Sequence, residues 1–330
     1  MSDAVKIPLP KLALNLLLLL RGGSSKQIPE LALVLGVPSN LVAQAAEHLQ
    51  KHGCRLEIAL ESVKLLWTGW SWWRSVLEAE VEKSGRILGR HVLVFEKTTS
   101  TNDVAIQAAV SAHDPLVVLA DFQSRGRGRR SNNWVSSAGQ SALMSVLLPD
   151  RAPSDDSVTL AAALSCAEAL ERLTQLEFHL KWPNDVLIDN KKIAGILIET
   201  RPHRNDPRKI DLVIGIGVNV LQTPDDFPAS VAAHAVSLNM VRPGNWNLLD
   251  VIDAFLDELE KYCVAPVDLQ LLVEKWRSRC AMLGQMVRVN CGGVIIEGSV
   301  ADIDPMYGLV LRDGAGGIHF CHARETTVLD

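Results

Sequence analysis

The segment from Gln123 to Trp134 constrains the fold more than any other stretch of the chain. It reads Gln-Ser-Arg-Gly-Arg-Gly-Arg-Arg-Ser-Asn-Asn-Trp and lies between two apolar runs, 115–120 and 142–148, which are typical of buried strands. Its two glycines allow backbone conformations and close approaches that side chains forbid. Its four arginines cannot neutralise one another, and their forked guanidinium groups match phosphate or carboxylate oxygens. The segment therefore predicts an anion-binding loop between core strands, although an exposed basic hairpin or a nucleic-acid patch would also fit it.

The bulk composition makes this basic loop more informative. The chain has 330 residues and a net charge of −5, so we expect two or three globular domains without a general affinity for nucleic acid. The longest apolar stretch, Leu12 to Leu20, is too short to span a bilayer. The six cysteines contain no CxxC pair, which favours reduced thiols over a zinc site. These features predict a cytoplasmic protein that does not associate with membranes.

Residues 1–66 are predicted to form a helix-turn-helix domain. Apolar periodicity indicates helices at 9–21 and from about Lys26, and Gly36-Val-Pro38 forms the turn before a third helix that Ser39 would cap. The alternating segment 55–60 could supply a wing strand. The third helix would expose Asn40, Gln44, Glu47, His48 and Lys51, with its one firm cation at the end. Binding of operator DNA through residues 25–51 and a scaffold role without DNA both fit this pattern.

The middle of the chain contains polar groups at the ends of apolar strands. Four tryptophans between residues 67 and 73 favour packing between domains over a ligand cage. The run Thr98 to Asp103 lies at a strand-to-helix junction, where it would cap the helix or bind a neutral amide or urea. Lys181, Asp185 and Lys192 are charges in an otherwise apolar hairpin, which indicates a salt bridge such as Lys181–Asp185 or a bound ligand.

Two later segments complete the expected architecture. Residues 212–220 predict a core strand in which Gly217 permits close approach and Asn219 marks the end. The stretch from Leu221 to Ser237 predicts a loop that could fold over a site. From residue 283 the sequence alternates and turns on glycines, which predicts a small barrel-like β module.

At this point the chain resembles biotin–protein ligases of the longer bacterial type, which join a winged-helix repressor domain to the enzyme. The motifs that carry the resemblance are Ser100-Thr-Asn102, Gln123-x-x-Gly-Arg-Gly-Arg-Arg130 with Trp134, Lys181-Trp-Pro-Asn-Asp185, and Lys192-x-x-Gly-Ile-Leu-x-Glu199. It implies an α+β fold with an N-terminal winged helix-turn-helix at 1–66, a catalytic domain with a central mixed sheet and helices, like class II synthetases, at 67–281, and a small SH3-like β-barrel at 282–330.

The resemblance implies a two-step reaction. Biotin and MgATP would give biotinyl-5′-AMP and pyrophosphate, and a lysine of a biotin carboxyl carrier protein, a subunit of acetyl-CoA carboxylase, would then attack the mixed anhydride. The basic loop suits this chemistry, because two anions must be neutralised and aligned. A biotin-responsive repressor function is implied as well, in a monomer or a ligand-promoted homodimer.

The family's functional residues map onto positions of this chain. Residues expected to bind biotin are Ser100, Thr101, Asn102, Gln123, Arg127, Gly128, Arg129, Lys192 and Gly195. Residues expected to bind the nucleotide are Arg127, Arg129, Arg130, Trp134, Lys181, Asn184, Asp185 and Asn219. Residues expected to act in catalysis are Lys192, Arg127, Arg129, Asp185 and Lys181. Asp185 is also a candidate for contact with the metal or the substrate amine, but no protein side chain is assigned as a metal ligand.

The chain departs from the family in the basic loop. Ser131 and Asn132 stand where the family usually has Gly-Arg, so we expect weaker ATP binding or compensation by Arg125. Two alternatives stay open on these residues. One is a lipoate-type acyl-protein ligase, which shares the fold, and the other is a regulator that only senses biotin.

Overall fold

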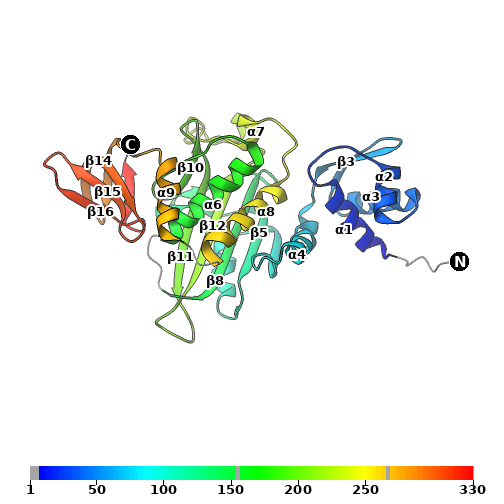
Figure 1. Cartoon of the computed structure of the whole chain (residues 1–330), viewed down its shortest axis with the longest axis horizontal. Coiled ribbons are helices and arrows are strands. Elements are labelled where there is room, and N and C mark those ends of the chain that lie inside the picture. The colour runs from blue at the N-terminus through cyan, green and yellow to red at the C-terminus, as the bar shows by residue number, and fades with distance from the viewer. Residues whose placement is uncertain (1–6, 153–156, 265–267, 330) are drawn as a thin grey trace.

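The computed structural model describes residues 7–152, 157–264 and 268–329. A small helical unit lies at the N-terminal end of the molecule, a large sheet with its helices lies in the middle, and a small β unit lies at the C-terminal end (Figure 1). The three parts follow one another along the longest axis in the order of the sequence.

The N-terminal unit is built from helices and a short antiparallel sheet. Its elements are α1 (Leu9–Leu20), β1 (Lys26–Gln27), α2 (Ile28–Leu35), α3 (Ser39–Lys51), β2 (Arg55–Ile58) and β3 (Ser62–Trp67), and its strand order is β1-β3-β2. Leu12, Leu16 and Leu20 of α1 are buried, and so is Leu49 of α3, because α1 packs directly on α3. The apolar repeat of α1 therefore forms the core of this unit.

Two predicted boundaries in this unit are corrected. The second helix begins at Ile28 rather than near Lys26, because Lys26 and Gln27 pair with Val63 and Ser62 as strand β1. Ser39 is the first residue of α3, and Pro38 occupies the N-cap position. Among the described residues no single helix is long and apolar enough to cross a bilayer, and α2 and α3 pass that test only as a pair bent by 98°.

The central sheet has seven strands in the order β4-β5-β8-β12-β11-β10-β9. They are β4 (Val92–Thr98), β5 (Leu116–Gln123), β8 (Ser141–Arg151), β9 (His179–Lys181), β10 (Asp185–Ile188), β11 (Lys191–Pro202) and β12 (Ile210–Asn219). β4 and β5 pair in parallel, and the other neighbours pair antiparallel. The predicted mixed sheet is confirmed.

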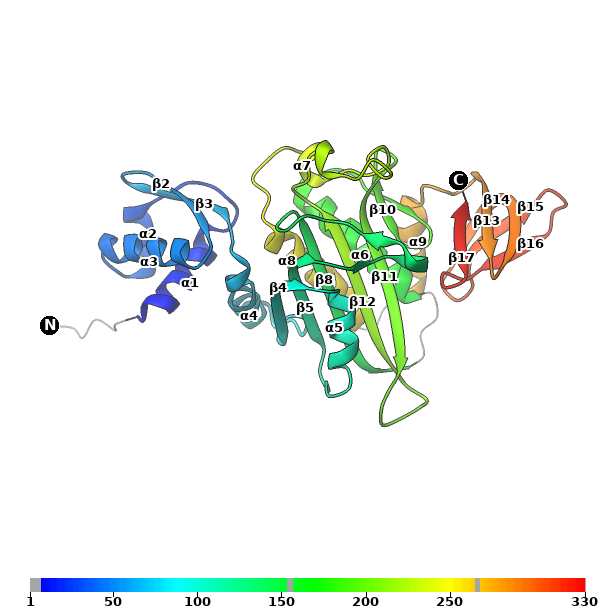
Figure 2. The ribbon, with the colours of Figure 1, turned by 180° about the vertical axis from the view of Figure 1, so that it is seen from behind.

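Helices cover the two faces of this sheet unequally. α6 (Ser157–Thr174), α8 (Leu248–Leu259) and α9 (Leu269–Arg279) cover one face (Figure 1), whereas the short α5 (Thr101–Ala108) lies on the other (Figure 2). A hairpin of β6 (Gly126–Arg127) and β7 (Asn133–Trp134) crosses the α5 face. The α5 face is therefore only partly covered, which leaves room for a site.

The C-terminal unit is a five-stranded antiparallel sheet. Its strands are β13 (Met286–Cys291), β14 (Val294–Asp304), β15 (Gly308–Asp313), β16 (Ile318–Cys321) and β17 (Thr326–Leu329), in the order β16-β15-β14-β13-β17. The alternating, glycine-punctuated sequence correctly predicted an all-β unit. All six cysteines are free thiols, as expected, and burial raises the pKa of Cys166 and Cys263 to about 12.

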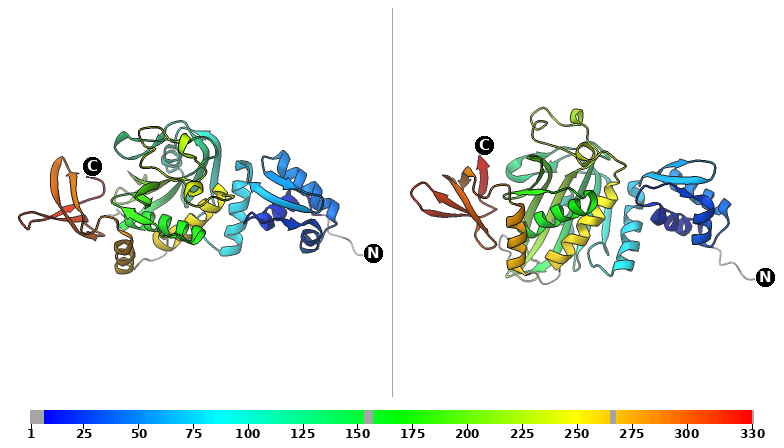
Figure 3. Two further views of the ribbon diagram at one scale, coloured as in Figure 1. Left: turned by 90° about the horizontal axis from the view of Figure 1, so that it is seen from above. Right: turned by 45° about the horizontal axis from the view of Figure 1, so that its top comes forward.

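The N-terminal unit is tied to the central part by charge and aromatic contacts. α4 (Trp73–Ser84) lies between them (Figure 3). Arg21, at the end of α1, bonds to Glu80 of α4 at 2.9 Å and to Asp250 and Asp253 of α8 at 2.8 and 3.0 Å. The ring of Trp72 meets the imidazoles of His48 and His52, at the C-terminal end of α3, edge-on, so this tryptophan packs against the N-terminal unit.

Candidate active site

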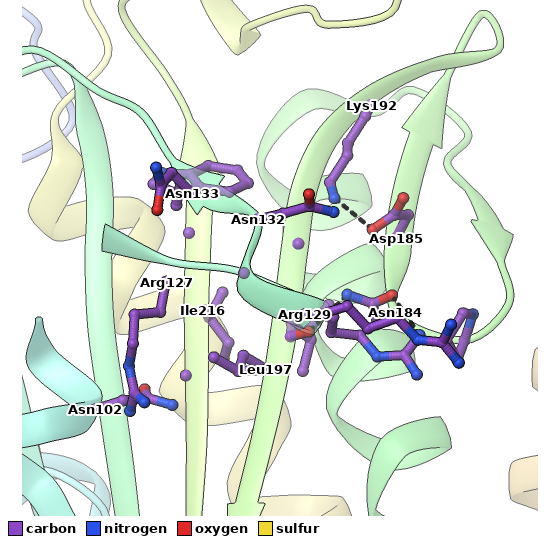
Figure 4. Close-up of a pocket in the computed structure, with 18 of the residues that line it drawn as sticks. Asn102, Arg127, Arg129, Asn132, Asn133, Asn184, Asp185, Lys192, Leu197 and Ile216 are labelled. Atoms are coloured by element: carbon purple, nitrogen blue, oxygen red, sulfur yellow. Dashed lines mark hydrogen bonds and ion pairs between the residues drawn. The ribbon is translucent and has the colours of Figure 1, made fainter. Parts of the chain in front are cut away.

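A pocket of about 370 Å³ opens on the α5 face, between the start of α5, the β6–β7 hairpin and the strands β10 to β12 (Figure 4). Its size suits a small organic ligand. The predicted site residues that line it are Ser100, Thr101, Asn102, Gln123, Arg127, Gly128, Arg129, Arg130, Trp134, Lys181, Asn184, Asp185, Lys192 and Gly195. The tertiary structure thus brings four separate motifs into one cavity.

Glycines form the floor of this pocket. Gly195 of β11 and Gly217 of β12 are register partners, so their missing side chains leave one flat area on the sheet. The indole of Trp134 rests there, because a Cβ at Gly217 would lie only 2.5 Å from its ring and a Cβ at Gly195 would lie 3.1 Å away. Gly215 lies two residues before Gly217 on β12, and its missing side chain leaves space for the side chain of Asn102. Strand glycines therefore let the hairpin and α5 approach the sheet closely.

Hydroxyl and amide groups line the end of the pocket near α5. The Gln123 side-chain oxygen accepts hydrogen bonds from the backbone N–H of Thr101 at 2.7 Å and from its hydroxyl at 3.2 Å. This assigns the orientation of the amide and leaves the Gln123 Nε2 group as a donor for a ligand. Ser100 stands at the N-cap of α5, yet its hydroxyl makes no capping hydrogen bond. The alternative interpretation of this run as helix caps is therefore not supported at Ser100.

The arginine loop has internal partners in this structure. Arg127 pairs with Asp103 at 2.9 Å and with Glu199 at 2.5 Å. Arg130 donates to the carbonyl of Glu325 at 2.6 Å. Arg129 donates to carbonyl oxygens of the same C-terminal turn, those of Ala323 and Thr326.

These contacts change two expectations. The arginines do not all await an external anion, because a carboxylate pair and the carbonyls of the C-terminal unit already hold three of them. Arg125 is exposed and does not line the pocket, so the structure gives no support to its compensation for Asn132, which does line it.

Lys192 faces the pocket from the start of β11. Its Nζ lies 2.6 Å from Asp185 Oδ1 and 5.9 Å from the centre of the Trp134 ring (Figure 4). The suggested Lys181–Asp185 salt bridge is therefore replaced by a Lys192–Asp185 bridge. The backbone of Lys192 also bonds to His234 and Val236 of the predicted loop at 2.7 and 3.0 Å, which fixes that loop beside the site.

Asn219 is the one predicted site residue that does not line the pocket. Its side chain is buried at the end of β12, where Nδ2 donates to the carbonyl of Val236 at 3.1 Å. It therefore holds the 221–237 loop to the sheet. The structure adds lining residues that sequence reasoning did not assign: Asn132, Asn133, Met144, Trp182, Pro183, Ile196, Leu197, Gly215, Ile216, Gly217, Thr327 and Val328. Gly215 and Gly217 carried a usable signal, because two glycines at i and i+2 on an apolar strand indicate one bare face.

Known proteins resemble the chain over this same region. Residues 94–219 match the model of the biotin/lipoate A/B protein ligase family. The biotin–[acetyl-CoA-carboxylase] ligase of Paracoccus denitrificans is 32% identical over 243 residues, which cover 68% of this chain and 95% of that protein. The chain belongs to the biotin protein ligase family.

A second curated relative and a solved structure are also similar to this ligase. The bifunctional ligase/repressor BirA of Bacillus subtilis is 30% identical over 240 residues, covering 70% of this ligase and 72% of that protein. The biotin protein ligase of Aquifex aeolicus, solved with biotin and ATP, aligns with a TM-score of 0.61 at 27% identity, covering 73% of this chain and 99% of that one. The fold and the enzyme class predicted from the motifs are confirmed for the part of the chain that aligns.

Proposed function

We propose that the pocket activates biotin with MgATP to biotinyl-5′-AMP and then passes biotin to a lysine of a biotin carboxyl carrier protein. One observation carries this proposal. A neutral hydrogen-bonding end, a lysine and an arginine loop meet in one cavity, and these are the groups needed to hold a ureido ring, a carboxylate and phosphates together. The names of the relatives, including an acetyl-CoA-carboxylase ligase, support the choice of substrate and carrier.

The ureido ring of biotin would occupy the α5 end. Gln123 Nε2 supplies a donor there, and the Ser100 hydroxyl can both donate and accept. The Thr101 hydroxyl gives its proton to Gln123 and can serve the ligand as an acceptor. Burial of these groups makes the end selective, because a ligand that fails to match them leaves buried polar atoms without partners.

The carboxylate and the nucleotide would meet beside Lys192, Arg129 and Arg130. When the carboxylate oxygen attacks the α-phosphorus, charge accumulates on the phosphate oxygens as pyrophosphate leaves. Fixed cations stabilise that charge without having to reorganise. Trp134 covers the floor above Gly217 and would help exclude water from the reactive anhydride.

Magnesium would enter with ATP as part of the substrate. Among the described residues no group of three or more His, Cys, Asp or Glu side chains could hold a metal, and Asp185 is the one carboxylate among the lining residues. Magnesium commonly binds through phosphates, water and one or two carboxylates. The site therefore fits a phosphate-borne ion, with Asp185 as a protein contact.

The proposed function also implies a division of the chain into three domains. Residues 1–66 would form a winged helix-turn-helix domain, 67–281 the catalytic domain and 282–330 an SH3-like barrel. Two features support the winged helix-turn-helix domain, namely the bend of 98° between α2 and α3 and the β2–β3 hairpin. Strand β3 itself runs to Trp67, one residue beyond the proposed boundary. Arg129 and Arg130 donate to carbonyls of the C-terminal turn, so the proposed barrel would contact the arginine loop of the catalytic domain.

Binding of operator DNA is a second candidate function that this geometry favours. α3 exposes Asn40, Gln44 and Lys51 beside Glu47. The bent helix pair would place these side chains at a groove. A gel shift with the operator region at low and moderate salt tests it, and a complex that weakens as salt rises is the expected result. No complex at low salt would make the unit a scaffold.

Pyrophosphate exchange tests the enzymatic proposal. The full chain should catalyse exchange of labelled pyrophosphate into ATP when biotin is present, and transfer biotin to a carrier domain. Exchange with lipoate and not with biotin would replace biotin by lipoate in this proposal. Absence of any acyl-AMP would refute it.

Replacement of Lys192 gives the sharpest single-residue test. Lys192→Ala should lower the single-turnover rate of adenylate formation by at least about a hundredfold, because a fixed charge near the transferring phosphoryl group is lost. Rapid-quench measurement of biotinyl-AMP checks this. Lys191→Ala is the matched control, since the neighbouring lysine is exposed and does not line the pocket. Equal rates for the two variants would contradict the role of Lys192.

A further inference from the structure

Glu199 lies just outside the pocket, yet it contacts two residues that line it. It stands on β11, and its side chain is 26% exposed. One carboxylate oxygen, Oε2, accepts a hydrogen bond from Asn102 Nδ2 at 2.7 Å and one from Arg127 Nη2 at 2.5 Å. A single group thus joins the first turn of α5 to the arginine loop.

The register of the sheet explains how Asn102 reaches this position. Gly215 pairs with Leu197 on one side and with Ser145 on the other. A Cβ at Gly215 would lie 2.1 Å from Asn102 Oδ1, so the amide rests directly on the bare glycine. Sequence position alone would not have placed Asn102 between β8 and β11.

The orientation of the Asn102 amide follows from its two neighbours. A carboxylate accepts hydrogen bonds only, so the NH₂ group must face Glu199. The oxygen then faces the Ser145 hydroxyl at 2.5 Å, and that hydroxyl lies 2.7 Å from Thr101 Oγ1. Thr101 in turn bonds to Gln123. Glu199 is therefore the charged end of a buried chain that runs under the α5 end of the pocket.

Arg127 is held by the same carboxylate. Asp103 and Glu199 flank one guanidinium at 2.9 and 2.5 Å, so the local group carries a net negative charge. A phosphate would be repelled from such a group, whereas a loop anchored there would stay close to α5. This geometry assigns Arg127 to loop positioning.

We propose that Glu199 is a positioning residue for biotin, acting through Asn102 and Arg127 and not through the nucleotide. The proposal rests on the proposed function, which puts the ureido ring at the α5 end. The carboxylate fixes the amide of Asn102, and through Ser145 and Thr101 it sets the donors and acceptors that biotin meets. It also keeps the first half of the arginine loop against that end.

Two replacements of Glu199 separate its functions. Glu199→Ala removes the acceptor and the charge, and it should raise the KM for biotin at least about tenfold while the KM for ATP stays within about twofold. Glu199→Gln keeps an acceptor oxygen for Asn102 and should bring the KM for biotin back to within about threefold of the unchanged protein. Both constants come from pyrophosphate exchange with the full chain.

Asp103→Asn is the matched control. It removes the other carboxylate from Arg127 and leaves the bond between Asn102 and Glu199 in place, so the KM for biotin should change less than about threefold. Circular dichroism of each variant confirms that it is folded. Should Glu199→Ala not fold, Glu199→Leu carries the test, because it keeps the bulk of the side chain but offers Asn102 and Arg127 no acceptor, and the same rise in the KM for biotin is expected.

Three results would overturn the inference. They are an unchanged KM for biotin in Glu199→Ala, a rise in the KM for ATP larger than the rise for biotin, and an effect of Asp103→Asn equal to that of Glu199→Ala. Failure of the proposed function would look different, because the unchanged protein itself would then show no exchange with biotin.

Discussion

At the scale of single residues, the nucleotide side of the site depends on which cations reach the cavity. Lys192 does so from β11, and Arg129 and Arg130 line the cavity while they donate to main-chain carbonyls of the C-terminal turn. Asn132 also lines the cavity but brings no charge (Figure 4). The exposed Arg125 does not replace it, so the phosphates would meet one cation fewer than the resemblance implies.

Restoring that cation is a direct test. Asn132→Arg should lower the KM for ATP by about threefold to tenfold, because an added guanidinium can bond to the phosphates in a partly screened position. The backbone carbonyl of Asn132 accepts from Gly128 N–H at 2.7 Å, and the substitution leaves this bond intact. Pyrophosphate exchange at varied ATP measures the effect. Asn132→Ala controls for loss of the amide, and an unchanged KM in Asn132→Arg would contradict the expectation.

At the scale of elements, the β6–β7 hairpin is held on the sheet by the fit of one indole into a glycine floor. β7 ends at Trp134, whose ring lies over Gly195 and Gly217, and β6 is close enough that a Cβ at Gly126 would meet the Trp134 carbonyl at 2.4 Å. The hairpin is therefore positioned by missing side chains as well as by the bond from Arg127 to Glu199 of the central sheet.

Filling the floor should lift the hairpin. In Gly217→Ala the new methyl group would overlap the Trp134 ring, so we expect weaker binding of both substrates and faster loss of biotinyl-AMP into solution, each by about tenfold or more. Trapping the released adenylate measures the loss. Gly314→Ala controls for glycine substitution, because no atom lies within 4 Å of its added Cβ. Equal adenylate release by both variants would show that the floor does not position the hairpin.

At the scale of the whole molecule, Arg21 ties the N-terminal unit to the rest through three carboxylates. Its side chain is 14% exposed and lies among Glu80, Asp250 and Asp253. Asp253 also pairs with the buried Arg86 at 2.8 Å, so the two arginines share one carboxylate. Burial raises the pKa of Asp250, and the nearby Arg21 opposes that shift. Loss of Arg21 would leave these acids facing each other.

Arg21→Ala should therefore loosen the N-terminal unit and lower the free energy of unfolding by about 1–3 kcal/mol. Small-angle scattering should show a wider range of shapes, and thermal melting should show the lost stability. Arg74→Ala is the control, because its exposed i,i+4 pair with Glu78 contributes less than about 0.5 kcal/mol. Biotin-dependent exchange should change little, since the residues of the tie are separate from the pocket lining. Identical melting of the two variants would refute the tie.

The sequence by itself determined the elements and most of the site. Apolar runs marked the central strands, the arginine-glycine loop marked a segment that lines the pocket, and every predicted site residue except Asn219 lines the pocket. Such features are local, because a run of residue types sets backbone preference and side-chain chemistry together. The tertiary structure alone decided the partners. It joined Asp185 to Lys192 instead of Lys181, turned Arg129 toward carbonyls 194 and 197 residues away, and buried Asn219 under its loop. Hydrogen bonds and ion pairs require atoms within about 3–4 Å, and for residues so far apart in the chain only packing sets that distance.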